Sequence, residues 1–129
     1  MGPRPRILLA DDHPGVLERV SAILSVDFAV VGAVGDGRAA VDEALRLEPD
    51  LVVMDIMMPE LDGLHAAREL RQQGSQAKVI FLTVQTDEES LSAAQESGAV
   101  AYVQKSRMNS DLVPAIEQAL MGSDLTQNG

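Results

Sequence analysis

Short apolar runs alternate with amphipathic segments along most of the 129-residue chain. The runs consist of hydrophobic residues and glycine and lack the regular polar alternation of a half-exposed strand. This composition is typical of strands that are buried on both faces of a parallel sheet. The runs cover residues 7–10, 30–34, 51–54, 79–82 and 101–103. The pattern therefore predicts five buried strands.

In the amphipathic segments, hydrophobic residues lie three or four positions apart, as on one face of a helix. These stripes comprise Val16, Val20, Ile23 and Leu24, then Val41, Ala44 and Leu45, then Leu64, Ala67 and Leu70, and finally Leu112, Ile116 and Leu120. Segment 87–97 offers only Leu91 and Ala94, so we expect it to form the most weakly anchored helix. Five strands alternating with five helices predict an α/β fold, a doubly wound parallel sheet with right-handed crossovers.

Two prolines indicate where helices begin. Pro14 follows the first strand and suits the first turn of a helix, where no amide partner is needed. Pro114 is expected in the first turn of the last helix, with Ser110 or Asp111 as the N-cap.

Length, charge and cysteine content narrow the class of protein. We assign residues 1–122 to one compact domain and the small, polar residues 123–129 to a tail or the start of a linker. The absence of cysteine excludes disulfides and thiolate metal sites. A net charge of -10 argues against nucleic-acid binding by this domain alone. Without a signal peptide or membrane span in the sequence, we expect a cytoplasmic domain whose partners are proteins or cations.

Polar side chains that carry chemistry follow four of the predicted strands. Asp11 and Asp12 follow the first strand, Asp55 follows the third, Thr83 follows the fourth and Lys105 lies just beyond the fifth. In a doubly wound sheet, ligands bind beyond the carboxyl ends of the strands. We therefore expect these side chains to share one pocket.

Three carboxylates in one pocket need a compensating cation. At ~4 Å and an effective dielectric near 20, each pair of carboxylates repels by about 4 kcal/mol before relaxation. A hard divalent ion with oxygen ligands relieves this repulsion, and Mg²⁺ leaves coordination positions for water and phosphoryl oxygens. A carboxylate, a hydroxyl and an ammonium around such an ion are suited to phosphoryl transfer.

The segments LLADDHP, LVVMDIMMPELDGL, VIFLTV and AYVQKS resemble, in register, the signature of response-regulator receiver domains of two-component systems. The resemblance implies the flavodoxin-like strand order 2-1-3-4-5, which the chemotaxis receiver of the same family has. The motifs are most similar to those of receivers that precede helix-turn-helix DNA-binding domains. Whether such an output domain belongs to the same protein is left open.

The resemblance also assigns roles to the metal-binding residues. It implies that Asp55 is the phosphoacceptor, and that Asp12, Asp55 and the main-chain carbonyl of Met57 hold Mg²⁺ directly. It further implies that Asp11 binds the ion through water.

The remaining roles concern signalling. The resemblance implies that Thr83 hydrogen-bonds the phosphoryl group, that Lys105 pairs with a phosphoryl oxygen and that Tyr102 is a rotating switch. The donor would be a phosphohistidine of a sensor histidine kinase. Phosphorylation would change the surface offered to an output domain or to a second receiver in a homodimer, without membrane or direct nucleic-acid contact.

Other residues in these motifs receive structural interpretations. Asp62 is assigned to turn formation, and no role is assigned to His13, which we expect to face solvent. Ser106 follows Lys105 where many receivers have proline. Val84 stands where many receivers have a smaller residue, so we expect its side chain to narrow the access to Asp55.

Three other functions fit the sequence less well than a phosphorylated switch. A receiver-like module that binds partners without phosphorylation is disfavoured because every catalytic position is filled. A phosphatase with an external substrate would need a second acid two residues after the nucleophile, where Met57 stands. A nucleotide-binding domain would need a glycine-rich phosphate loop after the first strand, and Asp11 and Asp12 lie there instead. We therefore expect a protein that is not an enzyme acting on an external substrate.

Overall fold

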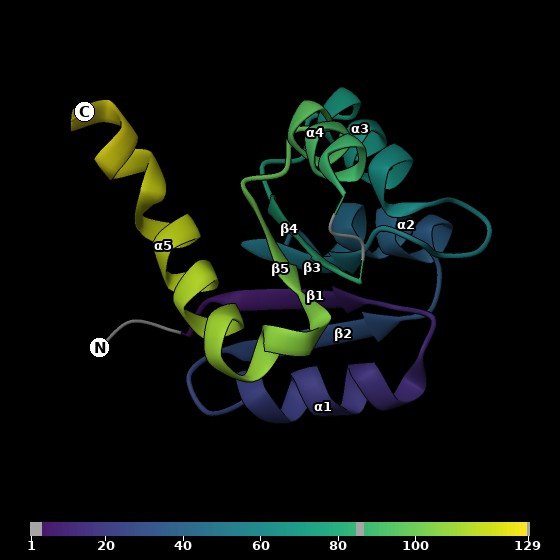
Figure 1. Cartoon of the computed structure of the whole chain (residues 1–129), viewed down its shortest axis with the longest axis horizontal. Helices are drawn as coiled ribbons and strands as arrows, with labels where there is room; N and C mark the ends of the chain where they lie inside the picture. Colours follow the sequence, from purple (N-terminus) through teal and green to yellow (C-terminus); the bar gives the residue numbers. More distant parts are fainter. Residues whose placement is uncertain (1–3, 85–86, 129) are drawn as a thin grey trace.

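The computed structural model describes residues 4–84 and 87–128, with side chains described as far as Met121. Its centre is a five-stranded sheet in the order β2-β1-β3-β4-β5, in which every neighbouring pair is parallel (Figure 1). The strands are β1 (Arg6–Ala10), β2 (Ala29–Val34), β3 (Leu51–Asp55), β4 (Lys78–Thr83) and β5 (Ala101–Gln104). The five predicted strands and their order are confirmed, but the prediction that all of them are buried on both faces is wrong for β2 and β5. No residue of β2 is fully buried and only Val103 of β5 is, because these two strands lie at the edges of the sheet.

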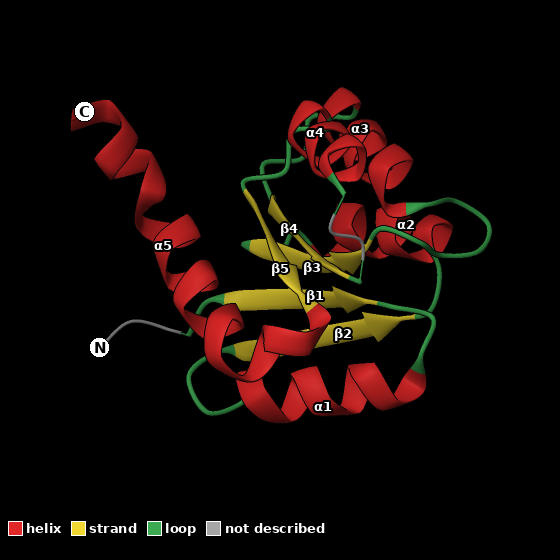
Figure 2. Ribbon diagram, viewed as in Figure 1, coloured by secondary structure: helices red, strands yellow, loops and turns green. Residues whose placement is uncertain are grey.

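Helices cover both faces of the sheet (Figure 2). They are α1 (Pro14–Leu24), α2 (Gly37–Leu47), α3 (Gly63–Gln72), α4 (Glu88–Glu96) and α5 (Met108–Asn128), with a short 3₁₀ helix η1 (Lys105–Arg107) before the last. Successive side chains of β1 enter opposite layers, as the pleat of a strand requires. Leu8 and Ala10 pack among residues of α2 and α3, whereas Ile7 and Leu9 pack among residues of α1 and α5. Burial on both faces explains why the central strands β1, β3 and β4 are almost entirely apolar.

Helix α4 has the smallest anchor on the core. Within this helix only Ala94 is fully buried, whereas α1 buries Val20 and Leu24 completely. Each fully buried large aliphatic side chain stabilises the docked state by about 1.5 to 3 kcal/mol. The burial pattern therefore agrees with the prediction that α4 is held more weakly than α1.

The start of α5 differs from the prediction. Pro14 does lie in the first turn of α1, but Pro114 lies inside α5, which begins at Met108 and not at Ser110 or Asp111. The reason is that η1 runs directly into α5, so the helix starts earlier than the proline suggests. Pro114 deprives the Ser110 carbonyl of an amide partner, and both residues are exposed, so water can replace that bond.

The C-terminal end of the helix also bears on a predicted boundary. Helix α5 continues through Asn128 and so crosses residues 123–129, which were expected to be a polar tail or the start of a linker. The assignment of residues 123–129 to a tail or the start of a linker stays a prediction. The domain boundary at residue 122 stays a prediction.

Candidate functional site

The carboxyl edge of the sheet collects the polar residues that the sequence singles out. Ala10 of β1 pairs in register with Met54 of β3, so the next residues, Asp11 and Asp55, emerge side by side. Thr83 at the end of β4 pairs with Gln104 of β5, which places Lys105 just beyond the same edge. Asp11, Asp55 and Thr83 are all buried. The topology thus brings together residues that lie far apart in the chain.

Lys105 links the two buried carboxylates. Its Nζ lies 3.0 Å from Oδ2 of Asp55, to which it donates a hydrogen bond, and 2.8 Å from Oδ2 of Asp11. The Lys105 side chain is only 13% exposed, so these ion pairs are shielded from water. Although Ser106 replaces the proline of many receivers, Lys105 reaches both carboxylates, and the peptide bonds of the described residues are all trans.

Burial and charge pairing have opposite effects on the pKa values of Asp55 and Lys105. Burial raises the pKa of Asp55 above its ordinary value, and the hydrogen bonds from Lys105 and from the Met57 amide oppose this effect without cancelling it. Burial lowers the pKa of Lys105, but its contacts with Asp11 and Asp55 outweigh burial and raise that pKa. Ionised Asp55 is therefore held at a cost in free energy that further positive charge would relieve.

The donor set fits a hard divalent cation. One oxygen or nitrogen atom from each of Asp11, Asp12, His13 and Asp55 lies within 4.8 Å of the others. Oδ2 of Asp11 is buried and lacks an aligned hydrogen bond, although Lys105 Nζ is near enough to pair with it electrostatically. Three carboxylates and one ammonium leave two formal negative charges, which a divalent ion would balance. Oxygen donors of this kind suit Mg²⁺.

His13 belongs to this cluster, which the sequence did not predict. Its ring is exposed, as expected, but Nδ1 lies 3.0 Å from Oδ1 of Asp11 and 3.2 Å from Oδ1 of Asp12. His13 is the N-cap residue of α1 and makes no side-chain cap bond. The sequence offered one signal for this contact, because His13 directly follows the two aspartates whose carboxylates its ring contacts.

The β3–α3 loop holds Asp55 in place. The amide of Met57 donates to Oδ1 of Asp55 at 3.2 Å, and the amide of Gly63 donates to the Ile56 carbonyl at 2.7 Å. A Cβ atom at Gly63 would collide with the Asp55 carbonyl oxygen, so only glycine permits this close approach. Asp62 caps α3 by accepting a hydrogen bond from the His65 amide at 2.9 Å. Its assignment to a structural role is confirmed.

The residues expected to signal lie near one another on β4 and β5. Thr83 is fully buried, and Val84 directly after it is exposed. Tyr102 lies on the edge strand β5, in register with Phe81, and is 38% exposed. A small cavity beside Tyr102 is lined by residues of α4 and β5, including Ala94 and Ala101. The switch roles of Thr83 and Tyr102, and the restriction of access by Val84, stay predictions.

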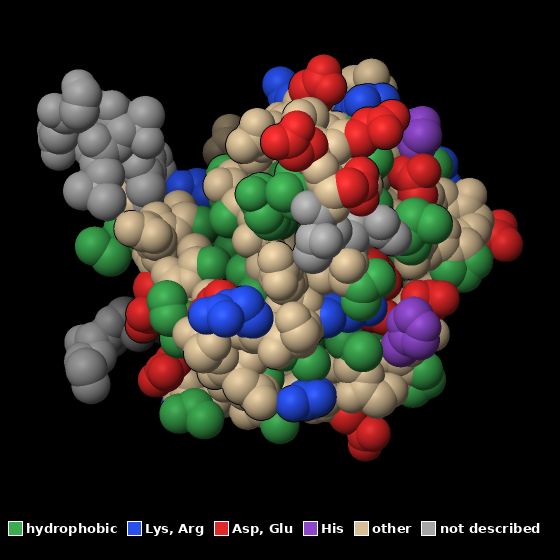
Figure 3. Space-filling model, in the orientation of Figure 1, with side chains coloured by type: hydrophobic (Ala, Val, Ile, Leu, Met, Phe, Trp, Pro, Cys, Tyr) green, Lys and Arg blue, Asp and Glu red, His purple; other side chains and the backbone are tan. Residues whose placement is uncertain are grey.

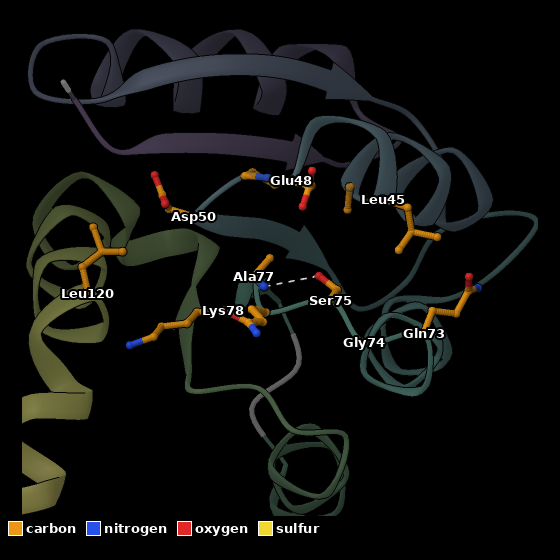
Figure 4. Close-up of a pocket in the computed structure, with 12 residues that line it drawn as sticks. Leu45, Glu48, Asp50, Gln73, Gly74, Ser75, Ala77, Lys78 and Leu120 are labelled. Carbon is orange, nitrogen blue, oxygen red and sulfur yellow. Dashed lines mark hydrogen bonds between the residues drawn. The ribbon is translucent and has the colours of Figure 1, made fainter.

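A broad groove lies at the opposite, amino-terminal edge of the sheet (Figure 4). Its charged lining residues are Glu48, Asp50 and Lys78. The last two have partners, because Asp50 accepts from the Arg6 amide at 2.8 Å and Lys78 donates to the Ala119 carbonyl at 2.7 Å. Ser75 accepts from the Ala77 amide. This groove contains none of the predicted site residues, so the chemistry belongs to the carboxyl edge.

Comparisons with known proteins identify the family of this chain. A doubly wound sheet with an acidic pocket and one lysine at its carboxyl edge defines the receiver class of signalling domains. The profile of the response regulator receiver domain matches residues 7–117. The chain therefore belongs to the response regulator receiver domain family of two-component systems.

Its relatives include proteins named as response regulators. The chain is 33% identical to the response regulator protein VraR of Staphylococcus epidermidis, over 93% of this chain and 58% of the relative. It is 34% identical to the nitrate/nitrite response regulator protein NarL of Escherichia coli, over 90% of this chain and 55% of the relative. The chain thus spans a little over half the length of these relatives.

Solved structures show the same fold. The signal receiver domain of the putative response regulator NarL from Mycobacterium tuberculosis superposes with a TM-score of 0.90 at 27% identity, covering 94% of this chain and 99% of that chain. A LuxR-family two-component response regulator from Aurantimonas gives a TM-score of 0.87 at 36% identity, covering 92% of this chain and 86% of that chain.

The surface adds two observations. Among the described residues, no helix has the length and apolar character needed to cross a membrane. On the face drawn in Figure 3, lysine and arginine side chains are scattered among acidic ones. The expectation that this domain alone does not bind nucleic acid stays a prediction.

Proposed function

We propose that this domain is a phosphorylation-activated switch that accepts a phosphoryl group on Asp55 from a phosphohistidine of a sensor histidine kinase. The observation that carries the proposal is the shared ion pair of Lys105 with Asp55 and Asp11 in a buried acidic cluster. This arrangement keeps a carboxylate nucleophile beside a positive charge that can pair with a phosphoryl oxygen.

A divalent ion completes the proposed site. The carboxylates of Asp12 and Asp55 and the main-chain carbonyl of Met57 would hold Mg²⁺ directly, and Asp11 would hold it through water. When bound, Mg²⁺ supplies positive charge to the oxygens of the transferring phosphoryl group.

The chain's own residues then carry out the transfer. A carboxylate oxygen of Asp55 attacks phosphorus, and a new O–P bond forms while the N–P bond of the donor breaks. The leaving imidazole nitrogen keeps the electron pair of the broken bond. Lys105 pairs with one of the phosphoryl oxygens and gives up part of its contact with Asp55. Water later hydrolyses the acyl phosphate, which releases inorganic phosphate and restores the Asp55 carboxylate.

The proposed readout involves the elements on the Thr83 side of the site. Thr83 would donate its hydroxyl to the phosphoryl group and draw the end of β4 toward Asp55. Helix α4 follows in the chain and is weakly anchored, so a small displacement can shift its equilibrium position. Tyr102 would then turn inward and alter the surface offered to an output domain or to a second receiver.

Intact-protein mass spectrometry tests the phosphoacceptor. With acetyl phosphate and Mg²⁺, the wild-type domain should gain one phosphoryl group, and Asp55→Asn should gain none. Asp62→Asn is the matched control, since Asp62 is another aspartate of the same loop and asparagine also caps helices well. Labelling of Asp55→Asn at the wild-type level, or of neither protein, would overturn the proposal.

A further inference from the structure

His13 contributes a nitrogen atom to a cluster that otherwise offers oxygen donors. Its Nδ1 lies 3.0 Å from Oδ1 of Asp11 and 3.2 Å from Oδ1 of Asp12. These two aspartates, with Asp55, form the acidic cluster of the site. The other histidine, His65, contacts a single aspartate, Asp62, with Nδ1 2.8 Å from its Oδ1.

We infer that Nδ1 of His13 is a ligand when a nitrogen-preferring divalent ion such as Ni²⁺ occupies this site. This inference rests on the metal site of the proposed function and extends its chemistry. A site that combines carboxylate oxygens with one imidazole nitrogen binds Ni²⁺, and other transition ions that prefer nitrogen, more tightly than oxygen donors alone do. The site is therefore selective between metals through His13.

The spacing of the donors supports this role. Ligands at ~2.1 Å from an octahedral ion lie about 3.0 Å apart when they are adjacent, because the two bonds meet at a right angle. The separation of 3.2 Å between Nδ1 and Oδ1 of Asp12, which would hold the ion directly, is close to this spacing. An ion shared by His13 and Asp12 would need only a small adjustment of these two side chains.

The local backbone directs the ring toward the carboxylates. The His13 amide donates to Oδ1 of Asp11 at 2.9 Å, and Pro14 restricts the backbone where α1 begins. The His13 side chain does not cap the helix; its Nδ1 shares a hydrogen bond with Oδ1 of Asp11 at 3.0 Å, which it would exchange for the metal. As a ligand, Nδ1 would carry no proton and the remaining ring proton would be on Nε2.

The His13 imidazole changes which metal the site prefers more than it changes the charge of the site. Neutral His13 adds a donor atom without adding a negative charge to the cluster. Mg²⁺ binds oxygen donors and favours water over imidazole, so loss of His13 should alter Mg²⁺ affinity little. Ni²⁺ gains the most affinity from the nitrogen donor, so its affinity should fall the most when His13 is replaced.

Isothermal titration calorimetry of the tag-free domain with NiCl₂ and with MgCl₂ tests the inference. His13→Asn keeps a good helix N-cap and replaces the nitrogen donor with an oxygen. Its Ni²⁺ affinity should fall by about tenfold or more, since even partners outside the ligand shell typically contribute that much to metal affinity. Its Mg²⁺ affinity should change by less than about threefold, which also shows that the variant is folded. His65→Asn is the matched control and should behave as wild type toward both ions.

The outcomes separate this inference from the proposed function. Equal Ni²⁺ affinity in wild type and His13→Asn, with Mg²⁺ still binding to both, would overturn the His13 role alone. Equal losses of Ni²⁺ and Mg²⁺ affinity would also overturn it, because His13 would then support the site without selecting the metal. Failure of wild type to bind Mg²⁺ would instead overturn the metal site on which both proposals depend.

Discussion

Removal of the Lys105 ammonium should reveal how strongly the carboxylates of the acidic cluster repel one another. Lys105→Met keeps most of the apolar stem and deletes the charge that lies 2.8 Å from Asp11 and 3.0 Å from Asp55. At an effective dielectric near 20, each contact is worth ~6 kcal/mol before desolvation is counted. Because Lys105 is also partly desolvated, the net loss is much smaller. Breaking a buried pair by removing one partner typically costs about 3 to 5 kcal/mol.

We therefore expect Lys105→Met to lower the free energy of unfolding by about 3 kcal/mol in EDTA. For a domain of this size, that corresponds to a fall in Tm of about 10 °C. Added Mg²⁺ should stabilise the variant more than the wild type, because its unbalanced carboxylates attract the cation more strongly. Urea and thermal unfolding followed by circular dichroism, each with EDTA and with Mg²⁺, measure both effects.

Lys78→Met is the matched control for this experiment. Lys78 is the only other lysine of the chain, and it donates to the Ala119 carbonyl at the opposite edge of the sheet. Its replacement should leave the response to Mg²⁺ as in the wild type. The electrostatic reasoning is refuted if Lys105→Met is as stable as wild type in EDTA, or if its gain from Mg²⁺ is no larger.

Four further predictions concern the same site. Mg²⁺ at ten times its Kd should stabilise the wild type by about 1.4 kcal/mol in thermal unfolding, and Asp12→Ala should abolish this gain. The pKa of Asp55 is raised, so the contribution of this group to stability is fully present below about pH 4, its ordinary pKa, and is lost as the pH rises through the raised value. Asp55→Asn should therefore be more stable than wild type at pH 7 in EDTA. An equal or lower Tm of the variant contradicts this. Val84→Ala should speed labelling by acetyl phosphate, and unchanged kinetics would show that Val84 does not restrict access. Beryllofluoride with Mg²⁺ should change amide exchange chiefly in residues 84–105, and equal changes in residues 16–24 would place the switch elsewhere.

Local pattern was enough to predict the elements of this fold. Each strand in the structure agrees with its predicted run to within one residue at either end, because the strand residues that pack against the helices form short, uninterrupted apolar segments. Pro14 marked the start of α1 correctly, since a proline before an amphipathic stripe has few other stable positions. The same reasoning failed at Pro114, because η1 supplies a helical turn that begins before the proline.

The sequence by itself determined the α/β class and the candidate residues of the site. The spacing of hydrophobic residues indicates which positions are buried, and the polar residues that follow the apolar runs lie at the strand ends. The strand order came from family resemblance, since periodicity does not say which strands are neighbours. Only the tertiary structure decided that Lys105 contacts both Asp11 and Asp55, and that His13 turns back over two aspartates. Such contacts depend on strand register and on the path of a loop. The strand register and the loop path set the contact distances between these side chains, and the spacing of the residues along the chain does not.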